Sequence, residues 1–545
     1  MKSFRIAAYA VLGAAVLSHP LAAQSRKPAR KVSTKKPAAA PPVPKMVTVV
    51  VLPVDSAPGD SVQAIVQRDL ENGDRVTPAF IDAATARAAA PLGRDSIDVL
   101  LLSPSKATAI VRITSGSPGF RATVYDAKTG LVRQSGDFRF PAVPADRRQA
   151  IRDSLAADLA ARAAEANARL ARDSATRDSL LRLNAAPPPK KKQNTKQRAA
   201  ARLIAAQRLA IVKEIEARRD TIFLGARRDT VVRDSILPLL LSADSVTRFR
   251  GIHAYRLAVH AMSDEIEDWL TGTHGISATR IAYVAGKNLH VVDSDGAMDE
   301  VIKTPGAALS PAWHPSGKSI VYSDFTDNGT QIGEVDLANE KVRLLAATKR
   351  GLNITPVYSR DGRYIIYGAG GDRPADLVMY EVGTTLAPMP LTDGRYENTS
   401  PSFSPDGTKM AFMSPRPTET PQIFVMNADG TKPKLLTPVV KGKRSYRTGP
   451  DWSPAGDAVA YEQQNGDFQV WMINLKTGKT TQLTSFMENE DPSWAPDGRH
   501  MTITSTRAGT RDIWVLDSRT GKFRQLTHVD GARLSAWSPL LHPAK

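Results

Sequence analysis

The chain contains 545 residues, of which 42% are hydrophobic and none is cysteine. A chain of this length divides into roughly two or three domains, and the lack of thiols excludes disulfides, cysteine nucleophiles and metal sites with cysteine ligands. The formal net charge of +18 could indicate nucleic-acid binding. However, about seven positive charges lie in residues 24–45 and a net excess of roughly ten lies in residues 147–220, whereas the chain from Arg280 onward is nearly neutral. The basic excess therefore belongs to a tail and an insertion, and we expect no nucleic-acid partner.

The N-terminal residues 1–23 have the pattern of a secretory signal peptide. M-K-S-F-R supplies a basic start, an apolar run extends from Ile6 to Leu17, and S-H-P-L-A-A-Q offers a small-residue cleavage site after Ala23. An apolar run of roughly a dozen residues is too short to span a bilayer, so we expect an exported, soluble protein that is cleaved near Ala23. Residues 24–45 are rich in lysine and proline and lack large apolar side chains, which predicts a flexible tail.

A small α/β domain is predicted over residues 46–140 and 251–273. It begins with the apolar, β-branched run V-T-V-V-V-L-P-V from Val47, which is typical of a buried strand, and an amphipathic helix follows. Further strands are predicted at Asp98–Ser103, Ala107–Thr114, Phe120–Asp126 and Leu131–Phe138. A final helix runs from Arg256 to a stop at Gly272. Its apolar face is predicted to consist of Leu257, Ala261, Ile266, Trp269 and Leu270.

Residues 141–250 interrupt this domain with a sequence rich in alanine, arginine, aspartate and serine. A weak apolar stripe at helical spacing runs from Leu155 to Ala171, and the P-P-P-K-K-K segment from Pro187 breaks it before a second helical stretch. A helical hairpin and a loosely ordered arm both fit this pattern. The polarity of the segment favours an exposed insertion over a dedicated binding arm.

The C-terminal half of the chain is a repeat. S-P-S-F-S-P-D-G at Ser400 has counterparts that begin at Ser310, Thr355, Gly449 and Asp491, with a truncated copy at Leu534. The aromatic residue of the motif recurs every 42 to 49 residues, which is the period of a four-stranded propeller blade. The region begins with the second strand of a unit at Arg280 and ends with a first strand at Trp537. We therefore predict a mainly β protein in which residues 278–545 form a six-bladed β-propeller, closed by its last strand and preceded by the α/β domain with its basic insertion.

Sequence motifs for catalysis, cofactor binding and metal binding are missing. Ser404 lies beside a Pro-Asp-Gly, but its counterparts include His314 and Ala495, which indicates a turn residue rather than a nucleophile. The sequence contains no G-x-S-x-G, no H-E-x-x-H and no phosphate-binding loop. His253 and His260, about two helical turns apart, fit an ordinary helix face better than a metal site. We predict no catalytic, cofactor-binding or metal-binding residue, and therefore a protein that is not an enzyme.

The repeat also suggests a family. The S-P-x-W-S-P-D-G units, joined to the helix ending D-E-I-E-D-W-L-T-G and to the junction T-R-I-A-Y-V, resemble the TolB family, the periplasmic propeller proteins of the Tol-Pal system. The resemblance is weak over residues 46–140 and strong from His253 to the C-terminus, whereas the insertion and the basic tail depart from the family pattern. It implies a non-enzymatic periplasmic scaffold that links a peptidoglycan-associated lipoprotein (Pal) to inner-membrane Tol partners, for outer-membrane integrity and envelope constriction in cell division.

Two other interpretations stay open at this point. A substrate-binding propeller related to prolyl-oligopeptidase-like or carbohydrate-active enzymes would share the S-P-D-G repeats. A cell-wall-binding protein could act through the basic insertion of residues 141–250.

A propeller without catalytic motifs is expected to act through its surface. The segments that lead into the innermost strands, here called the rim loops, converge on one rim of the ring and combine tyrosine, arginine, asparagine and carboxylates. TolB-like propellers bind Pal through this face. The partner-binding residues predicted here are Asn353, Tyr396, Glu397, Asn398, Thr399, Arg447, Glu490 and Asp491. The resemblance also implies that the mature N-terminal tail binds a TolA-like protein by strand addition.

Overall fold

The structure is a computed structural model. It describes residues 46–542 except 55–58, 92–95, 117–118, 140–251, 328, 339–340, 346–350, 372, 417–419 and 439–444, and within 140–251 it describes only a few isolated helical positions between 171 and 182. The predicted signal peptide and tail lie outside the described residues, and so does almost all of the predicted insertion. In the described part of the chain, no helix combines the length and the apolar character needed to cross a bilayer.

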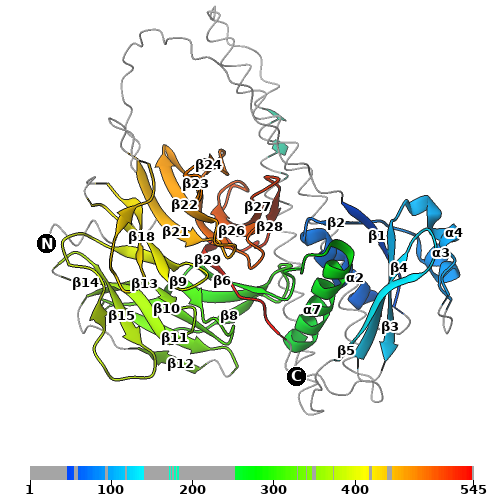
Figure 1. The fold of residues 1–545 in the computed structure, drawn as a ribbon, viewed down its shortest axis with the longest axis horizontal. Helices are drawn as coiled ribbons and strands as arrows, with labels where there is room; N and C mark the ends of the chain where they lie inside the picture. Colours follow the sequence, from blue (N-terminus) through cyan, green and yellow to red (C-terminus); the bar gives the residue numbers. More distant parts are fainter. Residues whose placement is uncertain are drawn as a thin grey trace, which may run out of the picture. The chain divides into compact units, whose positions relative to one another are not determined.

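The first part of the described chain is built on a five-stranded mixed sheet with the order β2-β1-β3-β4-β5. Strand β1 pairs in parallel with β2 and β3, and the remaining pairs are antiparallel. The elements, seen at the right of Figure 1, are β1 (Val47–Val51), α2 (Gly59–Asn72), β2 (Val76–Pro78), α3 (Ala83–Ala89), α4 (Val99–Leu102), the 3₁₀ turn η1 (Ser103–Ser105), β3 (Ala109–Gly116), β4 (Gly119–Asp126), β5 (Val132–Arg139) and α7 (Ile252–Thr271).

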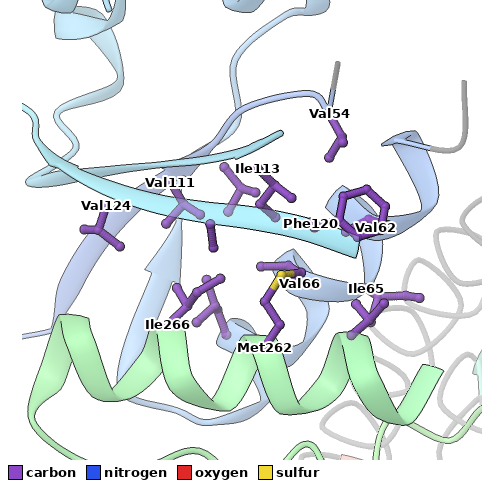
Figure 2. Packing of buried hydrophobic residues seen from close by; sticks show 14 of the residues in the cluster. Val54, Val62, Ile65, Val66, Val111, Ile113, Phe120, Val124, Met262 and Ile266 are labelled. Atoms are coloured by element: carbon purple, nitrogen blue, oxygen red, sulfur yellow. The ribbon is translucent and has the colours of Figure 1, made fainter. Parts of the chain in front are cut away.

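The two faces of this sheet pack against different helices. Successive side chains of a strand point to opposite faces, so Val111 and Ile113 belong to the core under α2 and α7, whereas Ile110 belongs to the core under α3 and α4. Figure 2 shows Met262 and Ile266 of α7 directed towards the sheet. The sequence prediction of a small α/β domain before the propeller is confirmed.

The strand predicted at Asp98–Ser103 is wrong, because this segment forms the short helix α4. The Asp98 side chain accepts a hydrogen bond from the Leu100 amide at 3.0 Å and caps the helix. Leu102 is buried, whereas Leu100 is 79% exposed. A run of apolar residues does not distinguish a strand from a short helix, and here the N-cap decides.

Helix α7 is buried on two sides. It ends where predicted, at Gly272 with a φ of 71°. Its apolar side consists of Tyr255, Ala258, Val259, Met262 and Ile266, with Trp269 and Leu270 partly buried. Leu257 and Ala261, which were predicted to lie on this face, are only half-buried. The difference arises because a polar stripe is buried beside the apolar one, and it consists of Arg256, His260, Asp264 and Glu267.

The rest of the chain forms six four-stranded antiparallel sheets, as predicted for a six-bladed propeller. Each blade is named here by its order around the ring. Blade 1 contains β29 (Arg533–Trp537), β6 (Arg280–Ala285), β7 (Asn288–Asp293) and β8 (Glu300–Ile302); blade 2 contains β9 (Ala307–Trp313), β10 (Ser319–Thr326), β11 (Gly329–Asp336) and β12 (Lys341–Leu344); blade 3 contains β13 (Leu352–Tyr358), β14 (Tyr364–Gly370), β15 (Asp376–Glu381) and β16 (Met389–Pro390). Blade 4 contains β17 (Thr399–Phe403), β18 (Lys409–Ser414), β19 (Gln422–Asn427) and β20 (Lys434–Leu435); blade 5 contains β21 (Tyr446–Trp452), β22 (Ala458–Asn465), β23 (Asp467–Asn474) and β24 (Thr480–Gln482); blade 6 contains β25 (Asn489–Trp494), β26 (His500–Ser505), β27 (Asp512–Asp517) and β28 (Phe523–Gln525).

The last strand of the chain closes the ring. Strand β29 pairs with β6, so the end of the chain completes the sheet that the first propeller strands begin. The Trp537 indole donates to Thr279 Oγ1 at 2.8 Å, and the Arg280 amide donates to Ser538 Oγ at 2.9 Å. This closure was predicted from the order of the strand-like segments.

The repeated S-P-x-W motif links neighbouring blades. Each innermost strand contains a β-bulge and one residue with a positive φ, namely Ser310, Thr355, Ser400, Gly449, Asp491 or Leu534. The Ser400 amide of blade 4 donates to Thr355 Oγ1 of blade 3 at 2.9 Å. Two residues further into the motif, Ser402 accepts from the Trp452 amide of blade 5 at 2.9 Å.

The polar stripe of α7 forms ion pairs with the propeller. Arg256 contacts Asp293 Oδ2, at the end of β7, at 2.8 Å and Asp295 Oδ2, in the turn that follows, at 2.7 Å. His260 Nδ1 lies 2.8 Å from Asp69 Oδ2 of α2. Asp69, His260 and Asp295 lie close enough together to hold a metal ion, but Arg256 already lies among these side chains and balances their charge. We interpret the cluster as an ionic seam between α7 and blade 1.

A second group of ion pairs extends this seam to blade 6. Arg75 bridges Glu267 of α7 and Asp497 of the turn after β25, at 2.9 Å in each case. His500 lies 2.8 Å from Asp497 and 3.4 Å from Asp74. Buried ion pairs are costly when one partner is removed, so the seam couples the stability of the two parts.

The stability of the seam should fall as the pH rises. Burial alone would lower the pKa of His260, but the charge of Asp69 and hydrogen bonds that the imidazolium donates to Asp293 and Asp69 raise it from 6.5 to about 10. Because the pKa is higher in the folded state, this stabilisation is complete below about pH 6.5 and is lost between about pH 6.5 and pH 10. Between these pH values, the free energy of unfolding measured in urea should fall by at least about 1.4 kcal/mol more in the wild type than in His260→Gln. This difference is the equivalent of one pKa unit.

A matched control for this measurement is His542→Gln at the exposed C-terminal end. This variant should follow the wild-type pH profile. A His260→Gln variant with the same pH dependence as the wild type would contradict the role of the imidazolium.

Candidate partner-binding rim of the propeller

The rim loops are held by a threonine that recurs at the end of the fourth strand. Thr484 Oγ1 accepts from the Val470 amide at 2.9 Å and donates to Gln469 Oε1 at 2.8 Å. The same residue type bonds the start of the third strand in blades 3, 4 and 6, at Thr392, Thr437 and Thr527. The L-T pairs of the sequence therefore anchor the beginning of four rim loops to their own blades.

Three asparagines lie at the other end of the rim loops. Asn353, Asn398 and Asn489 occupy equivalent positions, and their side chains are completely buried. Asn489 Nδ2 donates to the Phe486 carbonyl at 2.8 Å, and Asn398 Nδ2 donates to the Tyr396 carbonyl at 2.7 Å. One of the predicted partner-binding residues, Asn398, thus holds the conformation of its rim loop from inside, whereas Asn353 Nδ2 donates to the Thr330 carbonyl of blade 2 at 2.7 Å.

Two arginines that the sequence analysis missed support these asparagines. Arg416 donates to Asn398 Oδ1 at 2.7 Å and to Ser414 Oγ at 3.0 Å. Arg507 makes the equivalent contacts in blade 6 with Asn489 Oδ1 and Ser505 Oγ. The guanidinium of Arg416 also lies 5.5 Å from the ring centroid of Tyr396. The signal that could have identified the pair is the recurring S-x-R at the end of the second strand.

In blade 5 an arginine takes the place of the asparagine. Arg447 is only 6% exposed, and it donates to Gln422 Oε1 at 2.6 Å, to Gln463 Oε1 at 2.8 Å and to the Pro438 carbonyl at 3.0 Å. Burial lowers the pKa of its guanidinium. Arg447 therefore holds Pro438, at the start of the rim loop of blade 5, from within.

The acidic residues of the rim form one network across blades 5, 6 and 1. The Asp491 amide donates to Glu462 Oε1 at 2.8 Å, and Asp491 Oδ2 accepts from the Leu534 amide at 3.0 Å. Glu490 pairs with Arg511 at 3.2 Å. Burial and the neighbouring charge of Asp491 raise the pKa of Glu490 to about 7, and the same two causes raise the pKa of Glu462 well above its ordinary value. This part of the rim can therefore exchange protons near neutral pH.

Exposed apolar side chains lie beside these polar groups. Tyr396 is 37% exposed, and Phe486 and Met487 in the rim loop before β25 are 44% and 41% exposed. Glu397 is half-buried, and burial raises its pKa. Thr399 is buried at the start of β17. Of the eight predicted partner-binding residues, those available to a partner are Tyr396, Glu397, Glu490 and Asp491.

The structure distributes the eight predicted residues over four innermost strands and their rim loops. It brings Tyr396 and Asn398 into direct contact, and it places Glu490 and Asp491 in the acidic network. Phe486 and Met487 were not among the predicted residues. An apolar residue in a loop carries no repeat signal, since each blade differs at this position.

Truncation of Asn489 should loosen one rim loop. Asn489→Ala removes hydrogen bonds to Gln469, Phe486 and Met487 inside a buried site, and such a loss costs about 1–3 kcal/mol. Urea denaturation should show this loss, and amide exchange of residues 485–489 should become faster. Asn427→Ala, which removes an exposed turn contact to Thr431, serves as the control; equal effects of the two variants would contradict the anchoring role.

Comparison with known proteins agrees with this geometry. The family described as PD40, TolB beta propeller domain, matches residues 268–541. The Tol-Pal system proteins TolB of Bordetella pertussis and Bordetella parapertussis are each 29% identical over 259 residues, which is 47% of this chain and 58% of the relative. The chain therefore matches less than two thirds of the length of these relatives.

A solved structure extends the likeness of the fold to the first part of the chain. The crystal structure of TolB from Acinetobacter baumannii has a TM-score of 0.60 at 18% sequence identity, and the match covers 92% of this chain and 98% of that chain. The α/β sheet and the propeller thus occur together in that protein as well. Since the propeller family matches half of the sequence, the resemblance of the repeats is confirmed, and the chain belongs to the TolB family.

Proposed function

We propose that this chain is a non-enzymatic periplasmic scaffold of a Tol-Pal-type envelope system. In this proposal the propeller rim binds a peptidoglycan-associated lipoprotein and the N-terminal tail, residues 24–45, binds a TolA-like inner-membrane protein. The link between these partners would serve outer-membrane integrity and constriction of the envelope in cell division. The proposal includes cleavage of the signal peptide near Ala23. It also includes an α/β domain over residues 46–140 and 251–273, an insertion over 141–250 and a propeller over 278–545.

The observation that carries the proposal is the composition of the rim. Aromatic residues and methionine are enriched at the centres of protein interfaces, where they contribute most of the binding energy. Tyr396, Phe486 and Met487 are such residues, and each is more than a third exposed. Glu397 follows Tyr396 in the rim loop before blade 4, and Glu490 and Asp491 follow Phe486 and Met487 in blade 6. The carboxylates of these residues would favour a partner with cationic side chains.

The buried side of the rim supports the proposal in a second way. Binding costs free energy when flexible loops become ordered, and a loop that is already held in place avoids this cost. The rim loops of Tyr396 and Phe486 are held by Asn398 and Asn489, which are themselves fixed by arginines. The exposed side chains therefore project from loops whose conformation is already fixed before a partner binds.

Titration of the mature chain with the soluble domain of the cognate lipoprotein tests the proposal. We expect binding at micromolar concentrations, and Tyr396→Ala and Phe486→Ala should each weaken it at least about tenfold, equivalent to about 1.4 kcal/mol. Isothermal calorimetry measures the affinities, and circular dichroism checks the fold of each variant.

The control is Leu386→Ala, which removes a side chain that is 65% exposed in the turn between the third and fourth strands of blade 3. These turns lie at the opposite end of the blade from the rim loops, so the affinity should not change. The lack of any binding by folded protein would contradict the proposal. Binding of peptides or glycans that is lost in the rim variants would instead favour a substrate-binding propeller.

A further inference from the structure

Strand β5 is the long free edge of the α/β sheet. The sheet order β2-β1-β3-β4-β5 leaves β5 at one end, and among the described residues no strand pairs with its outer side. It runs for eight residues without proline, and all of them except Gly136 and Phe138 are exposed. An edge of this length presents unpaired backbone groups and is a template for pairing with another chain.

Apart from the innermost blade strands, which have five to seven residues and bond to neighbouring blades, the other sheet edges of the described chain are short. The outermost strands of the six blades have two to four residues, and β2 at the opposite edge of the α/β sheet has three. Short edges are one of the ways in which proteins prevent unwanted strand pairing. Strand β5 departs from this pattern, which indicates that its edge has a partner.

The charges on β5 are complementary to those of a second copy of the same strand. Arg133 and Asp137 lie two residues before and two residues after Ser135, so they have opposite signs and equal distances from it. Arg133 pairs with Asp126 at 2.5 Å, and Asp137 pairs with Arg121 at 2.7 Å. The side chains of Arg133 and Asp137 remain 42% and 64% exposed, so both can meet a further charge.

We propose that two copies of this chain pair through β5 in an antiparallel manner, with Ser135 on the two-fold axis. In this register Arg133 of each copy lies opposite Asp137 of the other copy. The charges then alternate in sign across the paired β5 strands. Asp126 and Arg133 of one copy are followed by Asp137 and Arg121 of the second copy. Opposite charges that face each other across an antiparallel pair are stabilising, whereas like charges are destabilising. The two sheets become one continuous sheet.

An apolar patch lies next to the start of β5. Leu131 and Val132 are 69% and 57% exposed, and Leu100 of α4 is 79% exposed. The neighbouring turn packs on α4, since a Cβ at Gly130 would lie 3.3 Å from Val99 Cγ1. In the antiparallel register this end of β5 meets the Phe138 end of the second copy, so the dimer removes apolar surface from water.

A strand from a different protein could bond the outward-facing backbone N–H and C=O groups of β5 equally well. It would need its own acidic and basic residues at a spacing of four to match Arg133 and Asp137. The second copy has this pattern by symmetry, and isologous contacts between identical surfaces are the commonest route to a dimer. The charge pattern therefore favours self-pairing.

A single engineered thiol tests the register. The chain has no cysteine, so Ser135→Cys introduces one reactive group per molecule. Residues directly opposite each other in an antiparallel pair have Cα atoms roughly 4.5–5.5 Å apart, which is within the span of a disulfide. We expect mild oxidation of the mature protein to yield a disulfide-linked dimer on a non-reducing gel.

The control is Lys128→Cys in the exposed β4–β5 turn. In the proposed register the two copies of this position lie far apart, at opposite ends of the paired strands, so cross-linking should be at least about tenfold slower than at residue 135. Equal rates of cross-linking at the two positions would overturn the proposed register.

Sedimentation velocity tests the association without a cross-link. The wild type should show a concentration-dependent dimer, and Ser135→Pro, which removes a backbone donor of the edge, should weaken it at least tenfold. Asp137→Arg places arginines opposite each other and should have the same effect, while circular dichroism remains unchanged. A wild type that stays monomeric throughout, or a dimer that neither variant weakens, would overturn the proposal.

Discussion

The closure of the ring by β29 is the constraint on which the rest of the propeller depends. Each blade packs only against its neighbours, so an open ring would leave two blades with an uncovered face. The last strand prevents this by bonding in both directions: Leu534 and Trp537 donate backbone hydrogen bonds to Asp491 and Ser493 of blade 6, and the Ala536 carbonyl accepts from Trp313 of blade 2. A strand added from the far end of the chain thus completes blade 1 and fixes its neighbours on both sides.

The same ring of contacts positions the rim. Four of the residues with positive φ in the innermost strands bond to the preceding blade, and the rim loops begin a few residues before them; the four are Thr355, Ser400, Asp491 and Leu534. Asn398, Asn489 and Arg447 hold the loops from inside, which leaves Tyr396, Phe486 and Met487 on the surface. The energetic roles are therefore divided: buried polar groups set the loop conformation, and exposed apolar groups are available to a partner.

Much of the fold could be predicted from the sequence because the propeller is a repeat. The aromatic position and the Pro-Asp-Gly turn recur in register, and this recurrence also identified Ser404 as a turn residue, whose hydroxyl bonds Asp406 at 2.5 Å. Contacts that occur once could not be predicted. The ionic seam joins Asp69, His260 and Asp293 from three distant segments, and the helix at Asp98 depends on one cap. At the rim, the residue types indicated which side chains are polar but not how deeply they are buried. Arg447 and Asn353 were therefore predicted as surface contacts although they are buried.

Hydrogen exchange at the closing strand tests this account most directly. If β29 closes the ring, the amides of Arg533–Trp537 should exchange as slowly as those of β6, with which they pair. Both strands should also lose their protection from exchange at the same urea concentration. If β29 instead exchanges far faster than β6 under native conditions, in the manner of a frayed C-terminus, the ring is not closed by this strand. In that case the rim cannot derive its rigidity from the closed ring.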